Sequence, residues 1–445
     1  SGCDIRQMSM QEYVNLVREK IDLNQLNVLD TELRYGNDFQ ILQGTLSSRV
    51  YIKHKNHRMQ TMLEKQIEPL YTFIHDLGGT YPSEYLTFLW KSLIKNHAHD
   101  SICGCSVDPV HRHMEDRYER MFETGNELIR RGMDFIAAHI SRDTLDDYMI
   151  TVMNTSEINR PCVFRTELEF PVGEKVTDFC LLDESGAALP YLVESHSVVT
   201  RPMLSPINLP GMLDVDHYDV IVDAGEISAL SYRSISVKTG TAAGELRPAV
   251  RKDYCLENEF IRANINPDGS IDLFDKQTKR CYSNIVTFED RGDCGDSYVY
   301  RKPEHDRVLT TDGVIPKVSC NCANALETSY SLEYVFIIPK EYDVYRGCRT
   351  NETVEERVVL TLTLRRGARE LECGVKIDNR AKDHRLRVRI HTGMKSDETM
   401  ASIPFDMVLR DKKELENGFQ NGTRPSNGVI LIQDETSGLA VYLKG

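Results

Sequence analysis

The sequence predicts a multidomain α+β protein in which an antiparallel three-helix bundle is followed by antiparallel β-sandwich domains. Its 445 residues are more than a single hydrophobic core usually organises. The apolar residues recur with a helical period up to about residue 145, and beyond that point the period becomes two. Apolar residues make up 40% of the chain and charged residues 27%, which is typical of a globular protein.

Three helices are expected before residue 145. The first follows Ser47-Ser48, whose hydroxyls suit a helix N-cap. The second begins near Pro82, after the break at Gly78-Gly79, and the third begins at Asp108-Pro109, where proline is tolerated in the first turn. The expected apolar face of the second helix consists of Tyr85, Phe88, Leu89, Leu93 and Ile94. Short links between the helices favour an antiparallel bundle.

Short strands with polar turns follow. Apolar residues alternate over residues 358–364 and 386–390, as in half-buried strands. Asn266-Pro267-Asp268-Gly269 is a turn pattern between two further strands. The stretch 240–244, Gly-Thr-Ala-Ala-Gly, indicates a linker between a smaller and a larger β domain. Closely spaced strands of this kind are typical of β-sandwiches.

Charge and cysteine usage narrow the class of protein. The formal net charge of −14 disfavours nucleic acid and anionic membranes as partners, and no apolar run is long enough to span a membrane. Twelve cysteines are scattered, mostly as single residues in apolar or strand-like runs, which favours reduced thiols and a cytoplasmic location. The chain opens at Ser1 without an initiator methionine, so we expect a piece of a longer protein.

The densest group of reactive side chains lies between the second and third expected helices. Residues 96–105, Asn-His-Ala-His-Asp-Ser-Ile-Cys-Gly-Cys, combine two imidazoles, a carboxylate and two thiols, which are the usual ligands of zinc. One interpretation is an interhelical loop that caps helix ends. Another is a self-contained zinc hydrolase site built from His97, His99, Cys103 and Cys105. The spacing of the two cysteines is tighter than in a zinc knuckle and favours packing.

The same segment resembles a signature of glycoside hydrolase family 38, the α-mannosidases, and in particular the bacterial branch that includes mannosylglycerate hydrolases. Further stretches resemble motifs of that family in the right order along the chain: residues 2–6, 44–49, 290–298 and 379–387. The resemblance implies metal-dependent, retaining hydrolysis of terminal α-mannosides in an oligosaccharide or in a mannosylglycerate-type molecule. It implies Zn²⁺ as the cofactor, a mannose-containing partner and a preference for homodimers.

The resemblance also assigns roles to four residues. His99 would be a metal ligand, and Asp100 would bind sugar hydroxyls. Asp4 would be the catalytic acid/base, and Tyr298 would hydrogen-bond the substrate. Retaining glycosidases use two carboxyl groups, so a nucleophile is needed as well. In the family, that nucleophile and a His-x-Asp pair of metal ligands belong to an upstream α/β-barrel, and nothing in this chain matches them.

The resemblance therefore suggests a domain plan. Residues 1–45 would be the last part of the catalytic α/β-barrel domain, 46–143 the three-helix bundle, 144–241 a small β-sandwich, and 242–445 a large β-sandwich that is incomplete at its C-terminus. The short connection after Asp4 suggests that residues are missing between Gln7 and Met8. A non-catalytic carbohydrate-binding or scaffold fragment is the main alternative to an active mannosidase.

Overall fold

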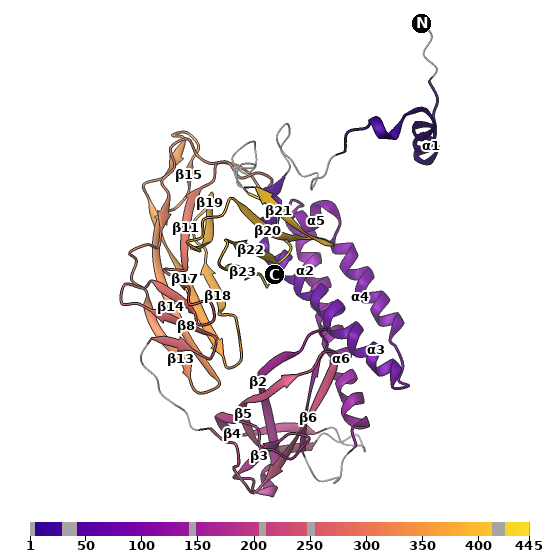
Figure 1. The fold of residues 1–445 in the computed structure, drawn as a ribbon, viewed down its shortest axis with the longest axis vertical. Helices are drawn as coiled ribbons and strands as arrows, with labels where there is room; N and C mark the ends of the chain where they lie inside the picture. Colours follow the sequence, from indigo (N-terminus) through magenta and orange to yellow (C-terminus); the bar gives the residue numbers. More distant parts are fainter. Residues whose placement is uncertain are drawn as a thin grey trace.

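A helical bundle runs alongside two β regions in the computed structural model, which describes residues 5–28, 42–141, 148–203, 211–246, 254–411 and 423–444 (Figure 1). The helical elements are α1 Met10–Lys20, η1 Leu23–Gln25, η2 Gln43–Leu46, α2 Val50–Thr61, η3 Met62–Ile67, α3 Glu68–Asp76, α4 Ser83–Asn96, α5 His99–Cys103 and α6 Asp108–His139. α2, η3 and α3 follow one another without a break, and η3 is a π-helical turn. This composite helix, α4 and α6 form the expected bundle.

The bundle core confirms the helical periods but corrects two details. α4 buries Leu86, Leu89 and Leu93 together with Asn96, whereas Tyr85, Phe88 and Ile94 of the predicted face are exposed. The apolar side chains of α4 wrap around most of the helix, so two stripes share Leu89 and Leu93, and periodicity alone cannot choose between them.

The predicted N-cap of the first helix is also wrong. α2 begins at Val50 after Arg49, which adopts a left-handed conformation with φ of 47° and provides no side-chain cap. The hydroxyls of Ser47 and Ser48 instead donate to the carbonyl of Gly44. Ser48 also donates to the carbonyl of Ser297, so this serine connects the start of the bundle to a loop of the large β region.

The small β region is a sandwich of two three-stranded sheets, in the orders β1-β6-β3 and β2-β5-β4. Its strands are β1 Tyr148–Asn154, β2 Arg160–Pro171, β3 Phe179–Leu182, β4 Tyr191–Met203, β5 Gly211–Ile227 and β6 Ser231–Thr239. Phe170, Phe179, Tyr191 and Tyr218 pack against one another between the sheets at centroid distances of 5.1–5.9 Å. These aromatic contacts supply much of the core of a region of fewer than a hundred residues.

The large β region is built from antiparallel sheets. Their strand orders are β10-β9-β8-β7, β13-β14-β17-β18, β12-β11-β19 and β21-β20-β22-β23, with the separate hairpin β15-β16. The strands are β7 Cys255–Glu257, β8 Ile261–Ile265, β9 Ile271–Asp275, β10 Cys281–Tyr282, β11 Val286–Gly292, β12 Leu309–Thr310, β13 Lys317–Ala323, β14 Glu327–Pro339, β15 Tyr342–Asp343, β16 Cys348–Arg349, β17 Thr353–Arg365, β18 Glu372–Asp378, β19 His384–Ile390, β20 Glu398–Ile403, β21 Asp406–Asp411, β22 Val429–Gln433 and β23 Gly438–Tyr442.

Two predicted features of this region are confirmed. Val358, Leu360, Leu362 and Leu364 of β17 are all buried, as the alternation predicted. The turn between β8 and β9 closes with a hydrogen bond from Gly269 N–H to Asn266 O. The strand period of two was therefore an accurate guide where one face of a strand enters the core.

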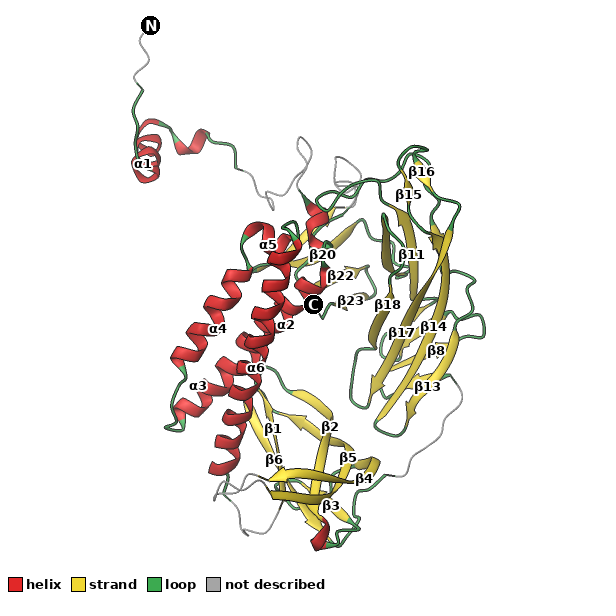
Figure 2. Ribbon diagram, turned by 180° about the vertical axis from the view of Figure 1, so that it is seen from behind, coloured by secondary structure: helices red, strands yellow, loops and turns green. Residues whose placement is uncertain are grey.

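Polar contacts connect the three regions. Thr155 donates to the carbonyl of Lys65 in the bundle, at 2.5 Å. Arg165 of the small sandwich pairs with Glu327 of the large β region at 2.8 Å. Figure 2 shows the small sandwich at one end of α6 and the large β region beside the bundle.

The N-terminal end of the described chain does not test the predicted barrel remnant. α1 is capped at its N-terminus by a capping box, in which the Ser9 and Glu12 side chains each accept from the other's backbone N–H. None of the residues of α1 is buried. The described residues before position 46 contain helical turns and no strand. No described helix combines the length and apolar character needed to cross a bilayer.

Candidate active site

The link between α4 and α6 positions the residues predicted from the sequence. Buried Asn96 ends α4, and its amide oxygen accepts from Arg117 Nε at 2.6 Å. The ring of the next residue, His97, donates to Asn56 Oδ1 at 2.6 Å. His97 is thus used within the bundle, whereas the side chains of His99 and Asp100 form no hydrogen bond with the described residues.

His99 and Asp100 form the first turn of the five-residue helix α5. Their side chains are 83% and 69% exposed, and His99 Nε2 lies 4.0 Å from Asp100 Oδ1. The carboxylate of Asp100 accepts no hydrogen bond from the described residues, so it is available to a ligand. Gly104 ends the helix with φ of 78°, a left-handed conformation that glycine adopts without strain.

Tyr298 reaches the same place from the large β region. It lies on the loop after β11, whose shape is set by Asp296: the carboxylate accepts from the backbone N–H groups of Tyr298 and Val299 at 2.9 and 3.0 Å. The carbonyl of Tyr298 accepts from Gly44 N–H at 2.9 Å. A Cβ at position 44 would lie 2.7 Å from that carbonyl oxygen, so glycine permits this close approach.

Electrostatic coupling links Tyr298 to the α5 turn. The neighbouring Cys105 raises the pKa of the Tyr298 hydroxyl, and burial and the Asp100 carboxylate add to the effect. Burial, followed by the charge of Cys103, likewise raises the pKa of Cys105. Tyr298 therefore stays a neutral hydrogen-bond donor near neutral pH.

A complete metal site is not formed by the described residues. His99 offers one ring nitrogen, whereas a catalytic zinc takes about three protein ligands. Among the described ranges, ligand atoms of three or more residues approach within 4.8 Å only at Glu167, His217 and Asp219, on the small sandwich. The structure therefore does not support the self-contained site of His97, His99, Cys103 and Cys105, and the donors near His99 do not fit a zinc ion without further ligands.

One group of interacting residues was not found from the sequence. β11 and β19 pair in antiparallel register, and this brings together the stretches 290–298 and 379–387. Asp290 is fully buried, and its Oδ2 accepts from His384 Nδ1 at 2.6 Å. Its other oxygen lies 2.5 Å from Arg349 Nη1. The His384 ring also lies 3.9 Å from Glu356. These residues lie far apart in the sequence, so only the tertiary fold brings them together.

Comparison with known families identifies the two larger parts of the chain. Residues 40–136 match the alpha mannosidase middle domain, and residues 256–445 match the glycosyl hydrolases family 38 C-terminal domain. The chain belongs to glycoside hydrolase family 38. The helical bundle and the large β region described above are the parts that carry these matches, which confirms the resemblance inferred from the motifs.

Individual relatives agree with this family. The chain is 26% identical over 423 residues to the "Putative mannosylglycerate hydrolase" of Halalkalibacterium halodurans, which covers 85% of this chain and 46% of the relative. An alpha-mannosidase from Enterococcus faecalis V583 superposes with a TM-score of 0.86 at 26% identity, over 97% of this chain and 53% of the other. A second Enterococcus faecalis protein of glycosyl hydrolase family 38 gives 0.83 at 25% identity, over 98% and 54%. The chain thus spans about half the length of these relatives.

Three of the four residues assigned from the resemblance lie in the described part of the chain. His99 and Asp100 lie side by side on α5, and Tyr298 lies on the loop after β11, near enough for Asp100 to affect its pKa. Asp4 lies outside the described residues. The roles of all four stay predictions.

Proposed function

We propose that this chain is part of an α-mannosidase that hydrolyses terminal α-mannosides with retention of configuration. The family supports a mannosidase-type glycoside hydrolase. The observation that carries the proposal for the site is that Asp100 and Tyr298, which come from two different regions of the chain, lie near enough for the Asp100 carboxylate to contribute to the raised pKa of the Tyr298 hydroxyl. A carboxylate acceptor beside a phenolic donor is suited to the vicinal hydroxyls of a sugar ring.

In this proposal, the chain binds and orients the sugar. Asp100 accepts hydrogen bonds from two ring hydroxyls, and such charge-assisted bonds are about twice as strong as neutral ones. Tyr298 donates to a third oxygen of the ring. The fixed close contact at Gly44 keeps the tyrosine loop in place, so little ordering is needed when the substrate binds.

The bond-breaking groups are proposed from the family. Retaining hydrolysis places two carboxyl groups about 5–5.5 Å apart, one as the nucleophile and the other as the acid/base. Asp4 is the proposed acid/base, and the nucleophile has no counterpart in this chain. His99 is proposed as one zinc ligand whose companions come from elsewhere. A bound divalent ion supplies charge stabilisation and a template for hydroxyl groups.

The substrate class is either a mannose-containing oligosaccharide or a mannosyl small molecule such as mannosylglycerate. The relative from Halalkalibacterium halodurans, which carries the second activity in its name, favours the smaller substrate. The cysteines of the described ranges are free thiols, which supports a reducing, cytoplasmic compartment for the proposed enzyme. A homodimer remains part of the proposal on the resemblance alone.

Activity and metal content of the intact protein test the site. His99→Ala should lower zinc content and the hydrolysis of a nitrophenyl α-mannoside together, whereas His113→Ala, an exposed histidine of α6, should change neither. Full activity with normal zinc in His99→Ala would refute the assignment.

The sugar-binding role of Asp100 has its own test. Asp100→Asn should lower kcat/KM about ten- to a hundredfold at unchanged zinc content, because it weakens charge-assisted hydrogen bonds. Glu119→Gln, an exposed carboxylate of α6, is the control. Assaying mannosylglycerate and an α-mannosyl oligosaccharide in parallel separates the two substrate classes. If the folded 445-residue chain is inert on both, this segment acts as a scaffold that needs the rest of the enzyme.

A further inference from the structure

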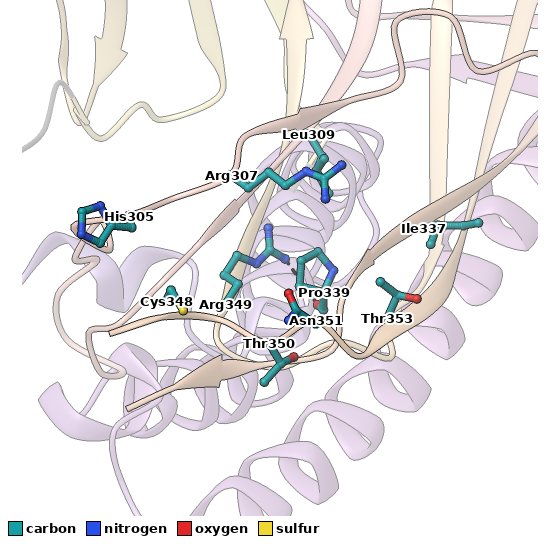
Figure 3. Close-up of a pocket in the computed structure, with 10 residues that line it drawn as sticks. All are labelled: His305, Arg307, Leu309, Ile337, Pro339, Cys348, Arg349, Thr350, Asn351 and Thr353. Carbon is teal, nitrogen blue, oxygen red and sulfur yellow. Dashed lines mark hydrogen bonds between the residues drawn. The ribbon is translucent and has the colours of Figure 1, made fainter. Parts of the chain in front are cut away.

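A polar pocket lies in the large β region, and none of the four residues assigned from the resemblance lines it. It has a volume of about 450 Å³. Its lining, drawn in Figure 3, comes from His305, Arg307, Leu309, Ile337, Pro339, Cys348, Arg349, Thr350, Asn351 and Thr353. The lining contains two arginines, a histidine and three neutral hydrogen-bonding side chains, and it contains no carboxylate.

Arg349 is the fixed element of the pocket. Its side chain is 3% exposed, and Nη1 lies 2.5 Å from Asp290 Oδ1. Nη2 donates to the carbonyl of Pro339 at 3.4 Å, whereas Nε has no hydrogen-bond partner in the described part of the chain. Gly292 leaves room for the stem, because a Cβ there would lie 3.0 Å from Arg349 Cγ and Cδ. The guanidinium is therefore held in place before any ligand arrives; Nη1 contacts Asp290 as an ion pair without a hydrogen bond, and Nε has neither kind of contact in the described residues.

Arg307 is the second cation of the lining. It is exposed, and it forms no ion pair or hydrogen bond with another described residue. Figure 3 shows the Arg307 and Arg349 guanidinium groups facing the same space. Arg349 is paired with Asp290, so it offers the pocket a hydrogen-bond donor, whereas Arg307 offers a positive charge. Guanidinium groups match carboxylate and phosphate oxygens with paired hydrogen bonds.

The remaining lining defines the kind of anion. Thr350, Asn351 and Thr353 add neutral hydrogen-bonding groups, and Leu309 and Ile337 form an apolar wall. We propose that this pocket binds the oxyanion group, carboxylate or phosphate, of a small organic molecule. Arg349 and Arg307 hold the anionic group, and the apolar wall receives the carbon skeleton. This site goes beyond the proposed mannosidase reaction and does not depend on it.

Calorimetric titration of the folded chain tests the chemistry of the ligand. Glycerate and inorganic phosphate are the anionic probes, and glycerol is the neutral counterpart of glycerate. At least one of the two anions should bind at millimolar concentrations. The anion with the lower dissociation constant shows whether the pocket prefers a carboxylate or a phosphate. Binding of glycerol as tight as that of glycerate, or no binding of either anion, would overturn the proposal.

Matched variants test the location. Arg307→Gln should raise the dissociation constant about tenfold, because it removes charge-assisted hydrogen bonds at an exposed position. Arg346 lies in the β15–β16 hairpin that carries Arg349, but it does not line the pocket, and its side chain is 74% exposed. Arg346→Gln should therefore leave binding unchanged. Equal binding by wild type and Arg307→Gln would place the anion elsewhere.

Cysteine protection provides a readout that is specific to the pocket. Cys348 lines it, and cleavage after glutamate releases residues 342–352 with Cys348 as the only cysteine. Glycerate or phosphate should slow the alkylation of Cys348 by neutral iodoacetamide, whereas exposed Cys320 should react at the same rate with and without the anion. An unchanged rate at Cys348 when the anion is bound would contradict the assignment.

Discussion

The α5 turn and the buried cluster around Asp290 use the same kinds of side chain in opposite ways. At α5, His99 and Asp100 face solvent with no hydrogen-bond partner in the described chain. In the large β region, Asp290 is fully buried and forms ion pairs with His384 and Arg349. Charged groups in water cost little to leave unpaired, whereas buried charges must be paired. Free exposed groups are therefore available to a substrate, and the buried ones hold strands together.

The largest expected effect is a loss of stability when the buried carboxylate of Asp290 is removed. Asp290→Asn leaves the Arg349 guanidinium buried without its counter-charge, and breaking such a pair costs about 3–5 kcal/mol. The measurement is the midpoint of urea unfolding, followed by a probe of the β region. Asp378→Asn, a half-exposed partner of Arg380, is the control and should stay within about 0.5 kcal/mol of wild type. Equal stabilities of the two variants would mean that Asp290 is not a structural charge.

This contrast also explains what the sequence could predict. The helices and strands were accessible because they leave a periodic pattern, as β17 does with its four buried leucine and valine side chains. The α5 segment was accessible because its polar residues are contiguous. The Asp290 cluster was not, since His384 lies 94 positions away and meets Asp290 only through the register of β11 and β19.

Local capping was predicted less well, for a physical reason. A serine before a helical period is a good N-cap only if the backbone places its hydroxyl over the first turn. Here Ser48 donates instead to Gly44 and to Ser297, 249 residues away in sequence. The start of α2 therefore depends on a long-range contact, which a local sequence pattern cannot reveal. The same applies to Tyr298, whose position beside α5 depends on the distant backbone of Gly44.

A backbone substitution sharpens the comparison, because it changes the exposed site without changing a charge. Gly44→Ala places a Cβ 2.7 Å from the Tyr298 carbonyl oxygen, so the loop must move. We expect a loss of about 1–3 kcal/mol in stability, typical of overpacking, together with a lower kcat/KM. Gly173→Ala, where a Cβ meets nothing within 4 Å, is the matched control. Unchanged activity in Gly44→Ala would show that the Tyr298 loop does not need this contact.

Glu289 is intermediate between fully buried Asp290 and exposed Asp100, because it is buried but contacts partly exposed arginines. The pH dependence of its contribution to stability is therefore a sensitive test of the comparison. The residue is 5% exposed, and its carboxylate contacts the partly exposed Arg291 and Arg387. Burial alone would raise the pKa of Glu289, but hydrogen bonds from the two guanidinium groups outweigh it and lower the pKa from 4.5 to about 2. A carboxylate with a lowered pKa in the folded state stabilises the protein above its unfolded pKa, and this contribution is lost as the pH falls towards the folded value.

Glu289→Gln should therefore be less stable than wild type at neutral pH by about 1–2 kcal/mol, a modest loss because both arginines can still reach water. The difference between the two proteins should shrink as the pH is lowered from about 5 towards 2, which thermal unfolding at a series of pH values measures. Glu352→Gln, which removes an exposed partner of Lys340, should show almost no difference at any pH. A gap between Glu289→Gln and wild type that persists at the lowest pH would mean that shape, rather than charge, makes Glu289 important. In that case packing, rather than charge pairing, stabilises the buried cluster around Glu289. The cluster would then differ from the α5 turn only in being buried.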